Sequence, residues 1–193
     1  MIKFLQHRPY LFWTLVGALV YIPFLGASHL FDWDEINFAE CAREMLVSGD
    51  YLSVQINFLP FWEKPPLFIW LQALSFWLFS TYTDQAWVSM EFAARFPNAV
   101  IGILTLWTLY AIGKKQWSAN FGNLWAFSYL VAITPHVYAS SGIIDPLFNL
   151  FIFLGLYFFA EFVADSKQLK NAGIAGVLIG LGMLTKGPVA LLL

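Results

Sequence analysis

Carboxylates and lysines stand at four separated places in an otherwise apolar sequence. They are Asp34, the pair Glu63-Lys64, Asp145 and Lys186. A lysine ammonium can neutralise a phosphate leaving group, and a carboxylate can take a proton from an attacking acceptor. If these side chains meet in the fold, the sequence predicts chemistry on a phosphate-bearing substrate.

Each of these residues also has a simpler structural explanation. Asp34 and Asp145 can cap helix N-termini, and Pro146 suits the first turn of a helix that starts at Asp145. Lys64 can be a snorkelling lysine in a turn at the membrane surface. Lys186, which precedes a Gly-Pro pair, can be an interface anchor. The elements that carry these residues decide between the two explanations.

The composition predicts an integral membrane protein. Of the 193 residues, 60% are hydrophobic and only 11% are charged. A single soluble domain averages about 45–50% apolar and about 25% charged residues, and a disordered chain is less apolar still. The net charge of −2 gives no indication of nucleic-acid binding, and the single cysteine, Cys41, excludes an internal disulfide.

Apolar segments of about 20 residues predict an all-α fold, a polytopic bundle of transmembrane helices. We expect five spans, near residues 10–31, 92–112, 121–140, 146–163 and 172–193. A sixth apolar segment, residues 67–80, would be only about 21 Å long as a helix, so we expect it in the membrane interface. Because the last segment is still apolar at Leu193, we interpret residues 1–193 as the N-terminal part of a longer membrane domain.

The distribution of basic residues predicts the orientation of these spans. With the N-terminus in the cytoplasm, the short inner loops hold six of the ten basic residues: Lys3, Arg8, Lys114, Lys115, Lys167 and Lys170. This excess agrees with the positive-inside rule. An uncleaved anchor is favoured over a cleaved signal peptide because the first apolar segment is long and bulky and further spans follow.

The predicted outer loop, residues 32–91, contains an amphipathic helix from Asp34 to Leu46. One face of this helix is apolar at 3.6-residue spacing, and Glu40, Arg43 and Glu44 are expected to face water. Ser48-Gly49-Asp50 ends the helix. This topology places Asp34, Lys64, Asp145 and Lys186, from four segments, at one membrane face, which favours chemistry on a lipid-linked phosphate.

Five short motifs occur in a characteristic order along the chain: Asp34-Glu35-Ile-Asn-Phe-Ala-Glu-Cys-Ala-Arg43, Glu63-Lys64-Pro-Pro-Leu, Ala94-Arg95-Phe-Pro-Asn, Asp145, and Leu184-Thr-Lys-Gly-Pro188. This ordered set strongly resembles the GT-C membrane glycosyltransferases. It is most similar to the bacterial relatives of protein O-mannosyltransferases and of the lipid A aminoarabinose transferase. Asn37 departs from the pattern, since many relatives carry arginine there.

The resemblance implies transfer of a sugar from a polyprenyl-phosphate-linked donor, with inversion, at the outer face of the bacterial cytoplasmic membrane. It implies that Asp34 and Asp145 are the catalytic carboxylates and that Lys64 and Lys186 bind the donor phosphate. The supporting residues of this site are predicted to be Glu35 and Arg43. Glu63 matches a residue that can ligate a divalent metal.

Other functions remain open at this point. The acceptor can be lipid A, a protein hydroxyl or a surface glycan, and the sequence does not identify the sugar. A transporter or flippase for lipid-linked or polar solutes is the main alternative, although transporters place ionisable groups near the bilayer midplane. A purely structural membrane subunit would leave the shared position of the acidic and basic residues unexplained.

Overall fold

The chain folds almost entirely into helices. A computed structural model describes residues 8–30, 33–83, 85–165 and 167–192. The elements in chain order are α2 (Pro9–Tyr21), α3 (Trp33–Ser48), β1 (Gln55–Ile56), β2 (Leu59–Pro60), α4 (Leu67–Phe79), α5 (Met90–Gln116), α6 (Ala119–Val131), α7 (Ile133–Ala139), α8 (Asp145–Ala164), α9 (Leu169–Lys186) and the 3-10 helix η1 (Gly187–Leu191). The predicted all-α fold class is confirmed.

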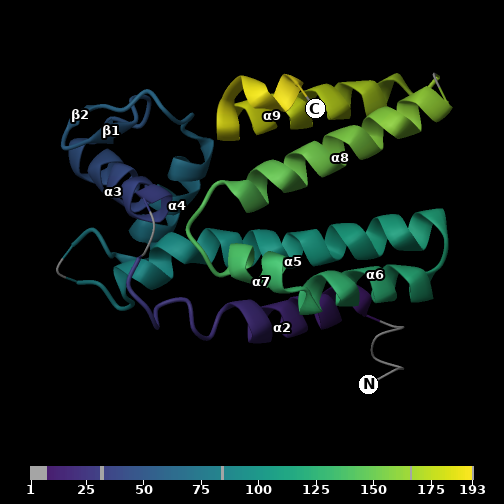
Figure 1. Cartoon of the computed structure of the whole chain (residues 1–193), viewed down its shortest axis with the longest axis horizontal. Coiled ribbons are helices and arrows are strands. Elements are labelled where there is room, and N and C mark those ends of the chain that lie inside the picture. The colour runs from purple at the N-terminus through teal and green to yellow at the C-terminus, as the bar shows by residue number, and fades with distance from the viewer. Residues whose placement is uncertain (1–7, 31–32, 84, 166, 193) are drawn as a thin grey trace.

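The long helix α5 is the centre of the bundle (Figure 1). Helices α2 and α6 pack along α5, and α8 packs against both α5 and α9. Helices α3 and α4 and the short β hairpin gather at one end of the long helices, where α8 begins and α9 ends (Figure 1). The segment predicted as an outer loop therefore forms a compact cap on one end of the bundle.

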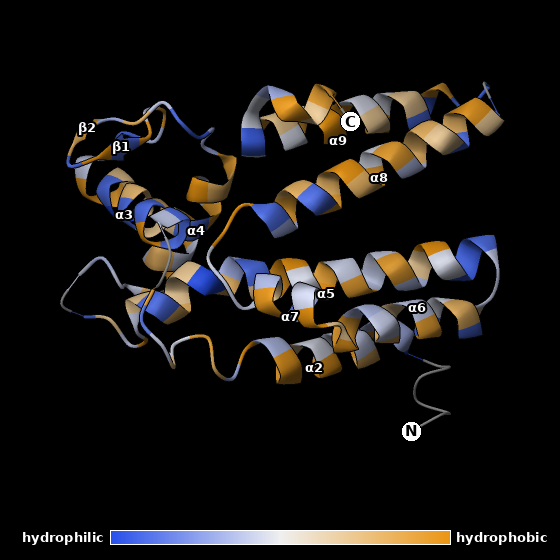
Figure 2. Ribbon diagram, viewed as in Figure 1, coloured by the Kyte–Doolittle hydropathy of each residue, from blue (hydrophilic) through white to orange (hydrophobic). Residues whose placement is uncertain are grey.

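Within the described residues, three helical segments are long and apolar enough to cross a membrane: Met90–Gln116, Asp145–Ala164 and Leu169–Leu191. They contain most of three predicted spans, at 92–112, 146–163 and 172–193. Leu193, the last residue of the third span, lies outside the described part of the chain. Apolar residues dominate all three helices (Figure 2). The number of membrane crossings in the whole chain stays a prediction.

The other two predicted spans contain shorter helices than expected. In the segment 10–31, the helix ends at Tyr21 and a series of turns follows, and Phe31 is outside the described residues. The segment 121–140 contains two helices, α6 and α7, because Ala132 has an extended backbone with ψ of 136°. Pro135 explains the break, since a proline nitrogen cannot donate to the carbonyl of Val131.

The two helices predicted for the outer loop are present as α3 and α4. Gly49, at a φ of +72°, lies just beyond the end of α3, and its N–H donates to the carbonyl of Met45. The expectation that Glu44 faces water is wrong, because its side chain is buried. The Glu44 carboxylate instead accepts a 2.8 Å hydrogen bond from the N–H of Phe58 in the hairpin.

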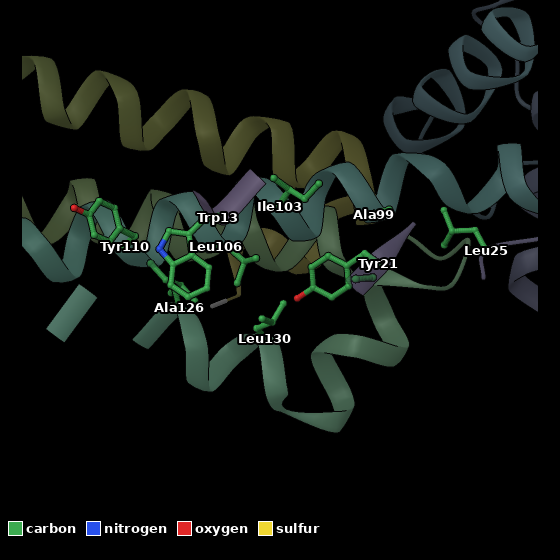
Figure 3. Close-up of a cluster of buried hydrophobic side chains, with 11 residues drawn as sticks. Trp13, Tyr21, Leu25, Ala99, Ile103, Leu106, Tyr110, Ala126 and Leu130 are labelled. Atoms are coloured by element: carbon green, nitrogen blue, oxygen red, sulfur yellow. The ribbon is translucent and has the colours of Figure 1, made fainter. Parts of the chain in front are cut away.

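Several apolar clusters hold the helices together, and two of them join α5 to its neighbours. The first joins α2, α5 and α6 through residues that include Trp13, Tyr21 and Leu106 (Figure 3). The second includes Phe38 of α3 and Phe68 of α4, together with apolar residues of α5 and α8. This second cluster lies under the start of α8, so it fixes the cap relative to the helix that carries Asp145.

Candidate active site

The first predicted pair, Asp34 and Lys64, comes together at the capped end of the bundle. Asp34 lies in the first turn of α3, and Lys64 lies between β2 and α4. The Nζ of Lys64 is 3.9 Å from Oδ1 of Asp34 and 5.8 Å from the centre of the Phe38 ring. Both side chains remain partly exposed, at 25% for Lys64 and 39% for Asp34, so they are accessible to a ligand.

The second predicted pair, Asp145 and Lys186, connects the start of α8 to the end of α9. The Nζ of Lys186 donates a 2.6 Å hydrogen bond to Oδ1 of Asp145 and lies 5.6 Å from the centre of the Phe148 ring. Asp145 is the first residue of α8, and no side-chain hydrogen bond caps this helix. The capping explanation for Asp145 is therefore wrong, because its carboxylate is directed to the lysine.

The two lysines line one pocket of about 350 Å³. Its walls include Lys64, Lys186 and Glu63, and its apolar rim includes Leu52 and Trp62. We call this cavity the lysine pocket. Gly187 at the end of α9 has a φ of +79°, a conformation that favours glycine, and this turn lets Gly187 and Pro188 line the pocket next to Lys186.

The resulting arrangement has a clear chemical capability. Two lysines, 122 positions apart, line one cavity, and each has an aspartate within 3.9 Å of its ammonium group, although neither aspartate is among the residues that line the cavity. Ammonium groups in a partly dry cavity neutralise phosphate, and an adjacent carboxylate can accept a proton. The prediction that Asp34, Lys64, Asp145 and Lys186 lie at one end of the molecule agrees with the structure, whereas their catalytic and binding roles stay predictions.

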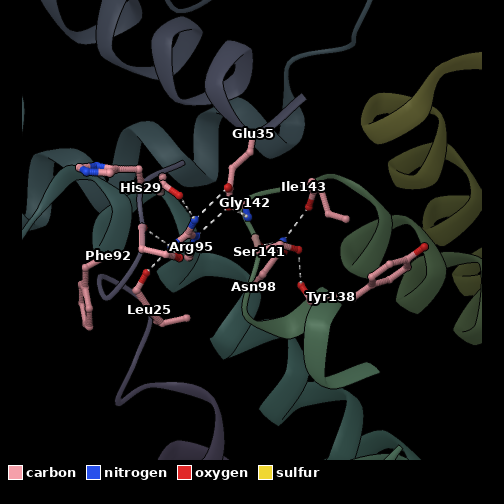
Figure 4. Close-up of polar contacts among 12 residues, drawn as sticks. Leu25, His29, Glu35, Phe92, Arg95, Asn98, Tyr138, Ser141, Gly142 and Ile143 are labelled. Carbon is pink, nitrogen blue, oxygen red and sulfur yellow. Dashed lines mark hydrogen bonds and ion pairs between the residues drawn. The ribbon is translucent and has the colours of Figure 1, made fainter. Parts of the chain in front are cut away.

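A buried ion pair between Glu35 and Arg95 lies next to this site (Figure 4). The carboxylate of Glu35 accepts from Nε of Arg95 at 2.7 Å, from its Nη2 at 2.9 Å, and from the N–H of Gly142 at 2.6 Å. Arg95 also donates to the carbonyls of Leu25, Ser28 and His29. The pair therefore joins α3, α5 and two loops through one hydrogen-bonded network.

Two buried amides extend this network to the loop that leads to Asp145. Nδ2 of Asn98 donates to the carbonyls of Ser141 and Ile143, at 2.6 and 2.7 Å. Nε2 of Gln72 donates to the carbonyl of Ala94 at 2.9 Å. Arg95 and Asn98 belong to one of the five motifs but had no predicted role, and Gln72 was not singled out. A further sequence signal was their polar side chains within apolar helices, where unpaired polar groups are costly.

Glu35 and Arg43, the two predicted supporting residues, lie in different surroundings. Glu35 is buried beside Asp34 in the network just described. Arg43 instead donates two hydrogen bonds to Glu40, at 2.6 and 2.9 Å, and is not among the residues that line the lysine pocket. These hydrogen bonds from Arg43 lower the pKa of Glu40. Within the described residues, no contact between Arg43 and the lysine pocket supports the predicted supporting role.

Glu63, the predicted metal ligand, lines the lysine pocket. In residues 8–30, 33–83, 85–165 and 167–192, no group of three or more His, Cys, Asp or Glu side chains is placed to hold a metal ion. The described residues therefore do not form a complete metal site around Glu63. Cys41 is a buried free thiol, and burial raises its pKa to about 12.

The helical membrane fold and the arrangement of its lysines and aspartates agree with the GT-C class of membrane glycosyltransferases. Residues 63–193 match the family described as dolichyl-phosphate-mannose-protein mannosyltransferase. The chain belongs to this family. Because the match extends over more than half of the chain, the resemblance inferred from the motifs is confirmed.

Curated relatives come from the aminoarabinose branch. The chain is 30% identical to the undecaprenyl phosphate-alpha-4-amino-4-deoxy-L-arabinose arabinosyl transferase of Pectobacterium atrosepticum, over 93% of this chain and 32% of that protein. It is 31% identical to the corresponding transferase 1 of Proteus mirabilis, over 97% of this chain and 33% of that protein. The chain thus spans about a third of the length of these relatives.

Solved structures support the fold. The crystal structure of ArnT from Cupriavidus metallidurans in the apo state matches 93% of this chain and 33% of that protein, with a TM-score of 0.80 and 23% identity. The same protein bound to undecaprenyl phosphate gives a TM-score of 0.76, also at 23% identity, over 96% of this chain and 34% of that protein. At this identity the likeness concerns the fold alone.

Proposed function

We propose that the protein transfers a sugar from a polyprenyl-phosphate-linked donor to an acceptor at the outer face of the bacterial cytoplasmic membrane. The observation that supports this most strongly is the lysine pocket, where Lys64 and Lys186 line one cavity and each lies beside an aspartate. The family match and the helical fold agree with this proposal.

The donor phosphate would bind between Lys64 and Lys186, which then neutralise the charge that builds up on the phosphate as the glycosidic bond breaks. Asp34 is the proposed general base because it lies in the first turn of α3, where its carboxylate is 39% exposed and thus open to an acceptor. Asp145, hydrogen-bonded to Lys186, would hold that ammonium toward the phosphate and serve as the second catalytic carboxylate. Attack opposite the leaving phosphate gives inversion.

The names of the relatives indicate which donor to test first. They are arabinosyl transferases of undecaprenyl phosphate-linked 4-amino-4-deoxy-L-arabinose, so this lipid is the first candidate donor. Lipid A, a protein hydroxyl and a surface glycan are the candidate acceptors. Mass spectrometry of lipid A and of glycans from a deletion strain would identify the acceptor by the product that disappears.

Substitution of the proposed base tests this function. In proteoliposomes that contain the donor and lipid A, Asp34→Asn should lower the transfer rate by about 10²- to 10⁴-fold, the usual effect of losing a general base. Asp50→Asn is the matched control, because Asp50 is an aspartate of the same cap whose carboxylate accepts hydrogen bonds from Leu52, Ser53 and Gln55, away from the lysine pocket. Transfer at the wild-type rate by Asp34→Asn would exclude Asp34 as the base.

The alternative function, a transporter or flippase, receives less support. Within the described membrane-length helices, charged side chains lie near the helix ends, as Lys186, Asp145 and Lys115 do. Transporters typically hold ionisable groups at the midplane. Movement of the lipid-linked sugar from one leaflet of the vesicle membrane to the other, without any transfer product, would favour this alternative.

A further inference from the structure

The tripeptide Ser141-Gly142-Ile143 lies between α7 and α8 and ends two residues before Asp145. It belongs to no helix or strand, so its backbone polar groups need partners from elsewhere in the molecule. Three buried side chains supply them: Glu35 of α3, Gln72 of α4 and Asn98 of α5. The tripeptide is therefore fixed to three helices at once.

These side chains hold four backbone groups of the tripeptide. Oε1 of Glu35 accepts the N–H of Gly142 at 2.6 Å, and Nε2 of Gln72 donates to the Gly142 carbonyl at 3.4 Å. Nδ2 of Asn98 donates to the carbonyls on either side, those of Ser141 and Ile143, at 2.6 and 2.7 Å (Figure 4). Because a buried polar group that loses its partner is costly, the tripeptide has little freedom to move.

Gly142 is packed too closely for any side chain. A Cβ added there would lie 3.1 Å from Cγ of Glu35, 3.2 Å from Nε2 of Gln72 and 3.3 Å from the carbonyl oxygen of Ala94. Non-bonded atoms prefer separations of about 3.5–4.0 Å. Since Ala94 belongs to the central helix α5, a side chain at position 142 would displace the tripeptide rather than the helix.

The tripeptide connects the two proposed catalytic carboxylates. Glu35 follows Asp34 in α3, and Asp145 comes three residues after Gly142. Ile144, just before Asp145, is buried in the apolar cluster that joins α3, α4, α5 and α8. Helix α8 has no side-chain cap of its own. Contacts of the tripeptide and of Ile144 therefore determine where Asp145 lies.

We infer that Asn98, Gln72 and Gly142 are positioning residues, which hold Asp145 in place relative to Asp34 and Lys186 through the tripeptide. Its consequence for sugar transfer rests on the proposed function, whereas the position of Asp145 can be measured without the reaction. A displacement of about 1 Å at a catalytic group can lower a rate by about 10²-fold. Loss of these contacts should therefore lower transfer by up to about that factor.

Zero-length cross-linking of the full chain in detergent measures the position of Asp145. A carbodiimide joins a carboxylate to an amine that it already contacts, so it should link Asp145 to Lys186, whose Oδ1 and Nζ are 2.6 Å apart. The ion pair between Lys115 and Glu161, at the opposite end of α5 and α8, provides an internal reference for an intact fold. Mass spectrometry of the digested protein gives the yield of both links.

Two variants should lower the yield of the Asp145–Lys186 link severalfold while the Lys115–Glu161 link forms as in the wild type. Asn98→Leu replaces the amide by a side chain of similar size that cannot donate, and Gly142→Ala displaces the tripeptide. The matched control is Gly176→Ala in α9, where a Cβ would meet no atom within 4 Å; it should keep both links. A wild-type yield of the Asp145–Lys186 link in both variants, or an equal loss of both links in both variants, would overturn the inference.

Transfer kinetics then test whether Asn98 acts through Asp145. The rates of Asn98→Leu, Asp145→Asn and the double variant form a double-mutant cycle. If Asn98 positions Asp145, the double variant should be no slower than Asp145→Asn alone. Multiplication of the two losses, as for independent sites, would contradict the positioning role. Because cross-linking needs no donor, it decides the position of Asp145 even where Asp34→Asn has excluded the proposed transfer.

Discussion

Two ion-paired regions, the Glu35–Arg95 network and the lysine pocket, lie close together, yet they differ in burial and in hydrogen bonding. The Glu35–Arg95 pair is at most 2% exposed, and its groups meet carbonyls, an N–H and each other. The two lysines that line the lysine pocket and the aspartates paired with them are 25% to 39% exposed, and the Asp34–Lys64 contact is 3.9 Å long. A satisfied buried pair fixes structure, whereas partly exposed charges around a cavity can bind a ligand.

The difference implies that changes in the network damage stability, whereas changes in the pocket damage binding. Arg95 and Glu35 connect α3 to the loop before Asp145, so their effect on the site passes through the fold. Lys64 and Lys186 contribute less to the fold because water already solvates part of each ion pair. Two predictions test this division and a third concerns the exposed loop at Asp50, from the largest expected effect to the smallest.

Arg95→Ala should have the largest effect. It removes the guanidinium that neutralises the buried Glu35 carboxylate, a change that typically costs about 3–5 kcal/mol of folding free energy. Thermal unfolding of the detergent-solubilised chain would show this as a lower midpoint and a loss of folded protein. The matched control is Arg43→Ala, which removes a half-exposed pair with Glu40 worth only about 0–1 kcal/mol. An equal drop of the unfolding midpoint in Arg95→Ala and Arg43→Ala would contradict the distinction between the buried network and exposed ion pairs.

The second prediction is that salt weakens donor binding at the lysine pocket more than it changes the stability given by the buried network. Raising the ionic strength from about 0.1 M to about 1 M shortens the Debye length from about 10 Å to about 3 Å, which screens exposed charges far more than buried ones. We expect donor binding to weaken severalfold while the unfolding midpoint of the wild type changes little. Binding measured by fluorescence at several salt concentrations, with unfolding measured in the same buffers, checks this. Salt-independent binding would indicate that the lysines do not meet the phosphate.

Asp50 should give the smallest effect, confined to acid pH. Its carboxylate accepts from the N–H groups of Ser53 and Leu52, and these hydrogen bonds lower its pKa from the ordinary 3.8. A lowered folded-state pKa means that the stabilisation is complete above pH 3.8 and is lost as the pH falls through the lower value. Hydrogen exchange of residues 50–60 at decreasing pH should show the loop opening in this window. Asp50→Asn should remove the pH dependence.

Much of this arrangement could be predicted from the sequence because its signals are local. The amphipathic pattern located α3, and apolar length with the preceding proline pair located α4. The last predicted span, 172–193, ran too far as a single α-helix, because α9 ends at Lys186 and the 3-10 helix η1 follows from Gly187. The shared position of the two lysines followed from counting spans. These inferences need only hydrophobicity, helix length and charge.

The remainder depends on contacts that no local pattern encodes. Arg95, the partner of Glu35, lies 60 residues away in the sequence. Glu44 is buried and accepts a hydrogen bond from the backbone N–H of Phe58, which lies 14 residues further on. The hairpin was not predicted because Asn57-Phe58 lacks the glycine that marks such turns. The break at Ala132 is different, because Pro135 marks it locally. It was missed because the apolar composition continues through it.

The most direct test of the central claim is the affinity of the full chain for undecaprenyl phosphate compared with undecaprenol, which lacks the phosphate. If Lys64 and Lys186 bind one phosphate, Lys64→Met and Lys186→Met should each weaken binding of the phosphate by about 10- to 100-fold, the usual range for a charged hydrogen bond. Binding of undecaprenol should stay unchanged in both variants. Wild-type affinity for undecaprenyl phosphate in either variant would contradict the claim.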